Sequence, residues 1–412
     1  MSNKHTGYAE ADLFAGELMS AISMPAISLI ALEKDAINAK YAKGEVRIVT
    51  EQARYPLPTV VGMYESSDYK LNPDFQRRHR WDAVKQSRLI ESFIMNVPIP
   101  PIFLYEVQYS QFEVMDGLQR MTAIYDFYKD KFALSGLEQW RELNGYKYSS
   151  LPDQVRKGID RRYLSSIILL KETAATPEEA QRLKQLVFER INSGGVTLAF
   201  QESRNAIYDG PLNRLCIRLA RNPYFCRMWE IPESTADEIE KQVYSEELLK
   251  NETFRRMEDV ELVLRFFAYR QRLNHEQTSL KEFLDAFLKH GNTLPEPTLN
   301  LYEGLFTKTV ETLYNTLGDS AFYMYRKRKN GTWYWYGRPT KVVYEPLMFA
   351  FSQRIHAADQ LIKQGEAIRT ALPSFYKEKY EVFEGRQVNQ SDMTLRNAAV
   401  GNFLDKFIVS AK

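Results

Sequence analysis

Val114-Met-Asp-Gly-Leu-Gln-Arg-Met-Thr-Ala-Ile124 joins a strand pattern to a helix pattern. Apolar residues alternate up to Val114 and recur at helical spacing from Met121 onward, which predicts a strand, a tight turn at Asp116-Gly117 and a helix. Gly117 can adopt a backbone conformation that a residue with a Cβ resists. We therefore expect the first half of the chain to be built around this turn.

The turn at Asp116-Gly117 also brings together groups that suit a phosphate. The N–H groups at the start of the following helix form an anion site, and Arg120 adds five donors in a rigid fork. Asp116 ends the strand, where its carboxylate is a candidate ligand for a hydrated Mg²⁺. Glu113 points to the opposite face of the strand. The alternative is a turn that is merely closed by a salt bridge, because Asp-Gly mostly marks turns.

Composition narrows the class of protein. The chain has 412 residues and a formal net charge of +2, so a nucleic-acid site must come from local patches. Apolar residues make up 44% and charged residues 26%, as in globular proteins. Two cysteines and five scattered histidines supply no metal-ligand spacing, which fits a reducing cytoplasm. The apolar stretch Leu18–Leu32 is too short for a membrane span, so no membrane association is expected.

Hydrophobic periodicity predicts an α+β protein in three parts. Residues 1–55 are expected to form an N-terminal helical extension, residues 56–198 a small mixed α/β domain, and residues 199–412 a helical domain. Strands of the α/β domain are expected at 102–107, 111–115 and 163–171, and helices at 83–95, 118–128, 152–159 and 177–192.

A β-hairpin is expected to interrupt the helical domain at residues 321–339, because Asn330-Gly331 separates two strand-like runs. Cations serve phosphates and aromatic faces stack on bases, which makes the hairpin the candidate nucleic-acid site. Its candidate residues are Arg326, Lys327, Arg328, Lys329, Trp333 and Trp335. The alternative is a hairpin that packs one aromatic face on the helices and leaves its basic tip in water, since side chains alternate along each strand.

Three stretches in order resemble one family, the N-terminal domain of GmrSD-type restriction enzymes (domain of unknown function 262). They are Pro73-Asp-Phe-Gln-Arg-Arg78 with Trp81, then Pro98-Ile-Pro-Pro-Ile-Phe-Leu-Tyr105 leading to Asp116-Gly-Leu-Gln-Arg120, and finally Phe188-Glu-Arg-Ile-Asn-Ser-Gly-Gly195 followed by Glu202-Ser-Arg-Asn-Ala206. The resemblance extends over residues 59–410. It implies a ParB/sulfiredoxin-like fold for the α/β domain, followed by a helical region.

The resemblance also implies that a nucleoside triphosphate binds, with Mg²⁺, and that several family members hydrolyse it to control a nuclease. By resemblance, Asp116, Gly117, Gln119 and Arg120 match the family's Asp-Gly-Gln-Gln-Arg signature. Arg120 would then hold phosphate, and Gln119 would position the phosphate or an attacking water. Leu118 replaces the first Gln of the signature, so the resemblance implies binding more firmly than hydrolysis.

Three further residues match the family motifs. Gln76 and Arg77 match an upstream Gln-Arg, which would close on the phosphate from a second segment, and Asn192 matches an Arg-x-Asn turn. The alternative for the arginines at 77, 78 and 80 is a solvated basic loop, and the alternative for Asn192 is an ordinary helix stop.

The sequence therefore predicts a nucleotide-binding regulatory subunit of a prokaryotic anti-phage or DNA-restriction system, with NTP hydrolysis as its candidate enzyme activity. A partner protein would carry the effector activity, because an HNH nuclease module is not recognised in this chain. That module needs an Asp-His pair, whereas His290 and His356 have no acidic neighbour and Glu276 follows His275. The alternative is a non-enzymatic DNA-binding adaptor that uses the hairpin and the region 77–88.

Overall fold

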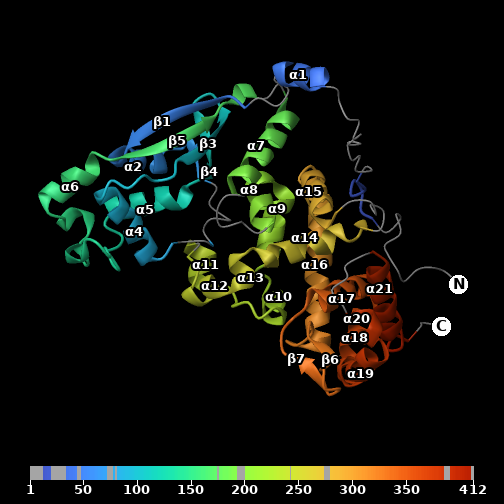
Figure 1. The fold of residues 1–412 in the computed structure, drawn as a ribbon. Coiled ribbons are helices and arrows are strands. Elements are labelled where there is room, and N and C mark those ends of the chain that lie inside the picture. The colour runs from blue at the N-terminus through green and yellow to red at the C-terminus, as the bar shows by residue number, and fades with distance from the viewer. Residues whose placement is uncertain are drawn as a thin grey trace. The chain divides into compact units, whose positions relative to one another are not determined.

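The protein has a mixed α+β fold, as predicted, with a small sheet in its first half and helices after it (Figure 1). The computed structural model describes residues 13–19, 34–43, 48–71, 78, 81–173, 176–192, 200–241, 243–272, 279–384 and 390–409. Its contacts divide the chain into two compact units. We call Ala26–Ile207 the α/β unit, and Met1–Pro25 together with Tyr208–Lys412 the helical unit.

The α/β unit is built on a five-stranded sheet in the order β1-β5-β3-β4-β2. The strands are β1 (Thr50–Pro56), β2 (Tyr69–Lys70), β3 (Ile102–Gln108), β4 (Gln111–Asp116) and β5 (Tyr163–Leu169). β3 pairs antiparallel with β4 and parallel with β5, and β1 pairs antiparallel with β5. The three strands predicted within this domain are confirmed.

Strand β1 corrects the expectation that residues 1–55 form a helical extension. Residues 50–55 belong to the sheet, because Ala53 and Tyr55 pack on its core and the backbone pairs with β5. Of the remaining extension, the structure describes α1 (Lys34–Lys43) and a non-helical turn at residues 13–19. Most of Leu18–Leu32 lies outside the described residues.

Three helices cover one face of the sheet: α2 (Leu57–Glu65), α4 (Ala83–Ile94) and α5 (Leu118–Tyr128) (Figure 1). Helix α4 begins at its predicted residue, where Asp82 caps it: Asp82 Oδ1 accepts a hydrogen bond from Lys85 N at 2.7 Å. Helix α7 (Pro177–Asn192) covers the opposite face beside β4 and has its predicted bounds. The unit also contains α6 (Asp153–Asp160) and α8 (Phe200–Ile207).

The helical unit is organised around α16 (Glu296–Leu317), whose buried side includes Tyr302, Phe306 and Val310. Its other helices are α9 (Pro211–Leu219), α10 (Pro223–Met228), α11 (Ala236–Lys241), α12 (Glu246–Lys250), α13 (Glu252–Arg255), α14 (Glu258–Ala268), α15 (Leu280–Gly291), α17 (Lys341–Gln353), α18 (Ala358–Lys363), α19 (Gly365–Glu378), α20 (Tyr380–Phe383) and α21 (Gln390–Asp405). The predicted hairpin is confirmed as β6 (Met324–Lys327) and β7 (Trp333–Tyr336). Within the described ranges, the structure contains no helix whose length and apolar character would suit a membrane crossing.

Residues 13–19 are fixed to the helical unit through a buried ion pair. Arg270 Nε donates to Glu17 Oε1 at 2.5 Å, and both side chains are almost completely buried. Gln271 accepts a hydrogen bond from Met19 N and donates one to Glu17 O, each at 2.8 Å. This short segment is therefore an integral part of the helical unit.

Candidate functional site

The turn after β4 has a conformation that requires glycine. Gly117 has φ +99° and forms the N-cap of α5 without a side-chain cap. A Cβ placed on Gly117 would lie 2.3 Å from Ile102 Cγ2 and 3.0 Å from Arg120 Nη2. The missing side chain thus allows Ile102, Arg120 and the backbone at the start of α5 to come close together.

Arg120 is held in one orientation at this helix start. Its Nη2 donates to Asp116 Oδ2 at 2.7 Å and to Pro101 O at 3.3 Å. The Arg120 side chain is 14% exposed and that of Asp116 40% exposed. Arg120 Nε is buried and has no hydrogen-bond partner among the described residues. The salt bridge that the alternative interpretation of this turn expects is therefore present, and it leaves the guanidinium with unused donor capacity.

Gln119 ties the first turn of α5 to the segment that precedes α4. Its Oε1 accepts a hydrogen bond from Trp81 N at 3.2 Å. The alternative for Arg78 was a position in a solvated loop. The structure contradicts this alternative, because Arg78 is only 2% exposed. The predicted phosphate-closing residues Gln76 and Arg77 lie outside the described residues.

On the opposite face of the sheet, Glu113 forms a buried ion pair with helix α7. Lys184 Nζ lies 2.7 Å from Glu113 Oε2, and both side chains are about one-tenth exposed. The Lys184 ammonium also lies 5.9 Å from the centre of the Tyr105 ring, and burial raises the pKa of that tyrosine. Asn192 is the last residue of α7, and its side chain lies outside the described residues.

The second part of the third family-like stretch, Glu202–Ala206, lies in α8, and sequence reasoning assigned no role to its polar side chains. Gln201, Glu202, Arg204 and Asn205 are all buried. Gln201 Nε2 donates to Asn205 Oδ1 and Arg204 Nη1 donates to Gln201 Oε1, both at 3.1 Å. The stretch thus contributes a buried polar network, which is costly unless its members satisfy one another.

Asp116 is the metal ligand that the sequence predicts at this turn. In the structure its carboxylate forms a salt bridge with Arg120. Among the residues that the structure describes, no three side chains of the His, Cys, Asp or Glu types lie close enough together to hold a metal ion. The donor set of this turn therefore suits an anion, with one carboxylate available to share a cation that the anion brings.

The hairpin places its predicted residues on two different faces. Trp333 stacks on Tyr325 with ring centres 5.7 Å apart and meets Tyr380 edge-on at 5.2 Å, while Trp335 meets Tyr376 at 6.2 Å. Both tryptophans thus contact aromatic rings of α19 and α20, while Trp335 is still 40% exposed, so stacking on bases at these two residues stays a prediction. The alternation of side chains along β7 places the two tryptophans on one face of the hairpin. The predicted cations Arg326, Lys327, Arg328 and Lys329 lie on β6 and its turn.

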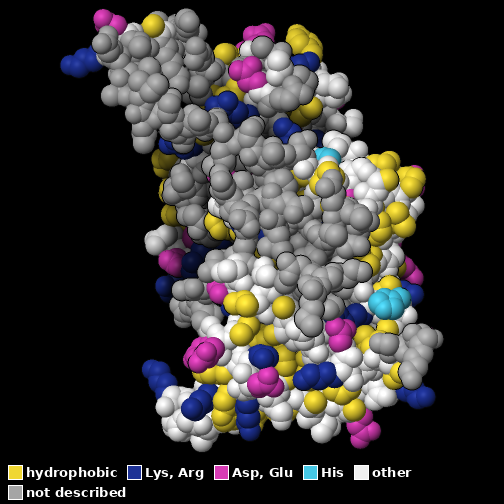
Figure 2. Space-filling model, turned by 90° about the vertical axis from the view of Figure 1, so that its right-hand side faces the viewer, with side chains coloured by type: hydrophobic (Ala, Val, Ile, Leu, Met, Phe, Trp, Pro, Cys, Tyr) yellow, Lys and Arg dark blue, Asp and Glu magenta, His cyan; other side chains and the backbone are white. Residues whose placement is uncertain are grey.

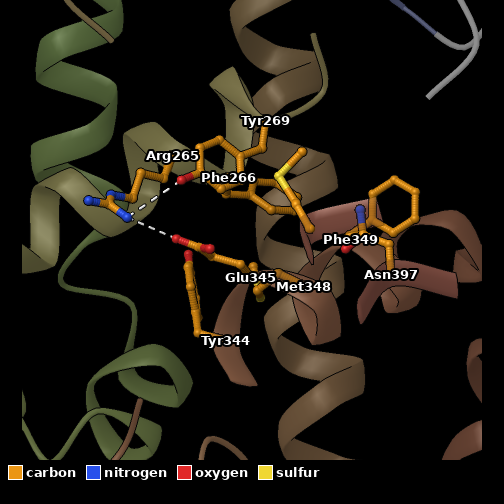
Figure 3. Close-up of a pocket in the computed structure, with 9 residues that line it drawn as sticks. Arg265, Phe266, Tyr269, Tyr344, Glu345, Met348, Phe349 and Asn397 are labelled. Carbon is orange, nitrogen blue, oxygen red and sulfur yellow. Dashed lines mark hydrogen bonds and ion pairs between the residues drawn. The ribbon is translucent and has the colours of Figure 1, made fainter. Parts of the chain in front are cut away.

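A separate small pocket lies among α14, α17 and α21 of the helical unit (Figure 3). Arg265 Nη1 lies 2.8 Å from Glu345 Oε1, and Arg265 Nη2 lies 2.8 Å from Glu261 Oε1. Burial raises the pKa of Glu345 despite the neighbouring arginine. Sequence reasoning missed this cluster because its residues belong to separate helices and form no local motif.

Residues 59–208 match the model of a family described as the GmrSD restriction endonuclease, N-terminal domain. The predicted resemblance is confirmed over these residues, which include the Asp116–Arg120 turn, α7 and α8, and the match does not extend to residues 209–410. No curated protein and no solved structure matches the chain, so the likeness to ParB and sulfiredoxin stays a prediction. The family match indicates a component of a restriction or anti-phage system.

Proposed function

Starting from this family match, we propose that the α/β unit binds the phosphates of a nucleoside triphosphate at the Asp116–Arg120 turn. The chain then acts as a nucleotide-responsive regulatory subunit of its restriction system. The observation that carries the proposal is Arg120, a largely buried guanidinium fixed by Asp116 and by Pro101 O, with its Nε unpartnered. A buried donor without a partner is costly, and an anion at this place would satisfy it.

The start of α5 supports the same ligand. A helix N-terminus offers backbone N–H groups and the positive end of the helix dipole. Gly117 caps this helix without a side chain, so the backbone can be approached closely. Arg120 adds a planar set of donors that fits two phosphate oxygens at once. The start of α5 and the Arg120 guanidinium together therefore suit a ligand with several phosphate groups better than a ligand with a single carboxylate.

Asp116 is assigned first to orienting Arg120, as the 2.7 Å salt bridge indicates. The Asp116 carboxylate is more exposed than the Arg120 side chain, so it can also share a hydrated Mg²⁺ with the phosphates. Mg²⁺ in nucleotide sites takes few protein ligands. When bound, Mg²⁺ neutralises phosphate charge. Gln76, Arg77 and Asn192 are proposed to complete the site from the neighbouring segments, on the strength of the family motifs alone.

Hydrolysis makes a further demand on Gln119. The side-chain oxygen of Gln119 accepts a hydrogen bond from Trp81 N, so one of its two acceptor positions is already used before a water is oriented. Binding of the phosphates makes no such demand on Gln119. We therefore propose nucleotide binding as the primary function and treat phosphate release as a separate measurement.

Thermal stability in the presence of ATP, GTP or CTP, with and without Mg²⁺, tests the proposal. A nucleotide at about one hundred times its Kd should stabilise the folded protein by about 2.7 kcal/mol. Arg120→Ala should abolish this gain. Arg88→Ala, which removes an exposed arginine paired with Glu138, should retain it. A cooperative transition that no nucleotide shifts would contradict the proposal and favour the DNA-binding adaptor.

A further inference from the structure

We propose that the open face of the β6–β7 hairpin binds the phosphate backbone of duplex DNA. This cationic face consists of Arg326 and Arg328, which lie over Tyr334 and Tyr336. It belongs to the helical unit, outside the family match at residues 59–208. The inference does not rest on the proposed nucleotide site.

The guanidinium groups of the two arginines lie over tyrosine rings. Arg326 Nε donates to the Tyr334 hydroxyl at 3.1 Å, and the Arg326 guanidinium carbon lies 4.3 Å from the centre of the Tyr336 ring. The Arg328 guanidinium carbon lies 4.3 Å from the centre of the Tyr334 ring. Stacking of this kind restrains the long side chains and leaves N–H groups at the guanidinium edges for an acceptor. Less rotamer entropy is then lost when a phosphate binds.

The hairpin concentrates positive charge that the protein itself does not neutralise. Six cations lie on it or beside it on α19: Arg326, Lys327, Arg328, Lys329, Arg338 and Lys377. Within the described part of the chain, none of the six forms an ion pair, whereas other arginines of the helical unit do. Examples of the paired kind are Arg221 with Glu238, Arg227 with Glu233 and Arg354 with Asp405. Unneutralised local charge is the electrostatic mark of a polyanion partner.

Surface position agrees with this charge pattern. At the lower end of the view in Figure 2, Lys and Arg side chains reach the surface among a few Asp and Glu side chains. Lys327, Arg328 and Lys329 are exposed, and Arg326 is half-buried beneath its contacts with the two tyrosines. The cations are therefore accessible to a partner as large as a nucleic acid.

Aromatic packing decides between duplex and single-stranded nucleic acid. A single strand is usually held by aromatic faces on which its bases stack. Here Trp333 stacks on Tyr325, and arginines lie over the two tyrosines of the cationic face, while Trp335, on the other face of the hairpin, meets Tyr376 edge-on and is 40% exposed. The cationic face itself therefore presents guanidinium groups rather than aromatic rings, which suits phosphates rather than unstacked bases. A two-stranded ribbon also fits the major groove of a duplex.

The tip of the hairpin is ordered enough to present these cations. Arg328 N donates to Thr332 O at 2.8 Å, and Asn330 Oδ1 accepts from both the backbone N and the hydroxyl of Thr332. Gly331 has φ +88°, which favours glycine at this place. The turn therefore holds β6 and β7 in register up to the end of the cationic face.

Fluorescence anisotropy with a short labelled duplex of mixed sequence, read over a range of salt concentrations, tests the inference on the full chain without nucleotide. The slope of log K against log salt reports the number of phosphate contacts. The double variant Arg326→Ala/Arg328→Ala should bind more weakly and lose about 2 units of slope, about one for each contact. Arg326→Lys/Arg328→Lys keeps the charge and should retain most of the slope, which separates charge from folding.

A matched control removes two exposed cations elsewhere in the helical unit. Lys250→Ala/Arg255→Ala deletes the same charge from residues already paired with Glu246 and Glu252, and its slope should equal that of the wild type. An unchanged slope in Arg326→Ala/Arg328→Ala, or an equal loss in the control, would overturn the inference. Tighter binding of the corresponding single strand than of the duplex would overturn the assignment to duplex DNA.

Discussion

Replacing Gly117 with Ala should both destabilise the α/β unit and close the proposed phosphate site. At φ +99°, a residue with a side chain is strained by about 1–2 kcal/mol. The added methyl would also lie 2.3 Å from Ile102 Cγ2, and overpacking of a core costs about 1–3 kcal/mol. Because Ile102 is fully buried, it has little room to move aside. We expect a total loss of about 2–5 kcal/mol in the free energy of unfolding.

Gly145→Ala provides the matched control for this substitution. Gly145 has φ +89°, close to that of Gly117, but a Cβ there would meet nothing within 4 Å. Its replacement should therefore cost only the backbone strain of about 1–2 kcal/mol. Denaturant unfolding followed by circular dichroism and tryptophan fluorescence measures both losses. Equal losses in the two variants would refute the steric argument, and nucleotide-dependent stabilisation that survives in Gly117→Ala would refute the close approach to the backbone.

Three other buried charges give further predictions. Lys184→Met leaves Glu113 buried without its partner and should cost about 3–5 kcal/mol in denaturant unfolding, most of which Glu113→Gln/Lys184→Met should recover. Glu17→Gln breaks the pair with Arg270 and should make residues 13–19 more sensitive to limited proteolysis; wild-type cleavage rates would contradict this. Burial raises the pKa of Glu345 above 4.5, so the folded state holds this proton more tightly than the unfolded state, and stability falls as pH rises from 4.5 through the folded pKa. Glu345→Gln should flatten that decline in thermal unfolding, and a profile parallel to that of the wild type would disprove the assignment.

Elements with local signals were predictable from the sequence. Asp82 caps α4, Asn330-Gly331 turns the hairpin, and α7 begins at Pro177 as expected. Each of these depends on residues within a few positions of one another. The salt bridge between Asp116 and Arg120 is likewise local, because the two residues lie four positions apart across the turn from β4 to α5.

Elements that depend on distant partners were not predictable. Strand β1 gains its structure from pairing with β5, which lies far along the chain, and its own composition gives no clear strand pattern. Helices α13 and α14 are separated at Met257, where φ is +55°. Local propensity could not indicate that break, since nothing in the residue type favours it.

The contacts at the candidate site also divide into local ones, which were predictable, and long-range ones, which were not. Gln119 contacts Trp81 across 38 positions and Lys184 contacts Glu113 across 71, and neither contact is visible in a sequence pattern. The stacking of Trp333 on Tyr325 is likewise not visible in the basic and aromatic pattern, which indicated stacking on bases, and that role stays a prediction.

The central claim is that Asp116 and Arg120 form a preorganised phosphate site, and calorimetric titration of a nucleoside triphosphate tests it most directly. Arg120→Lys keeps the positive charge but loses the planar fork and should weaken binding by about tenfold or more, a loss of about 1.4 kcal/mol or more. Asp116→Asn should weaken binding both with and without Mg²⁺ if the carboxylate orients Arg120. Wild-type affinity in Arg120→Lys, measured beside an unchanged Arg88→Ala control, would contradict the claim.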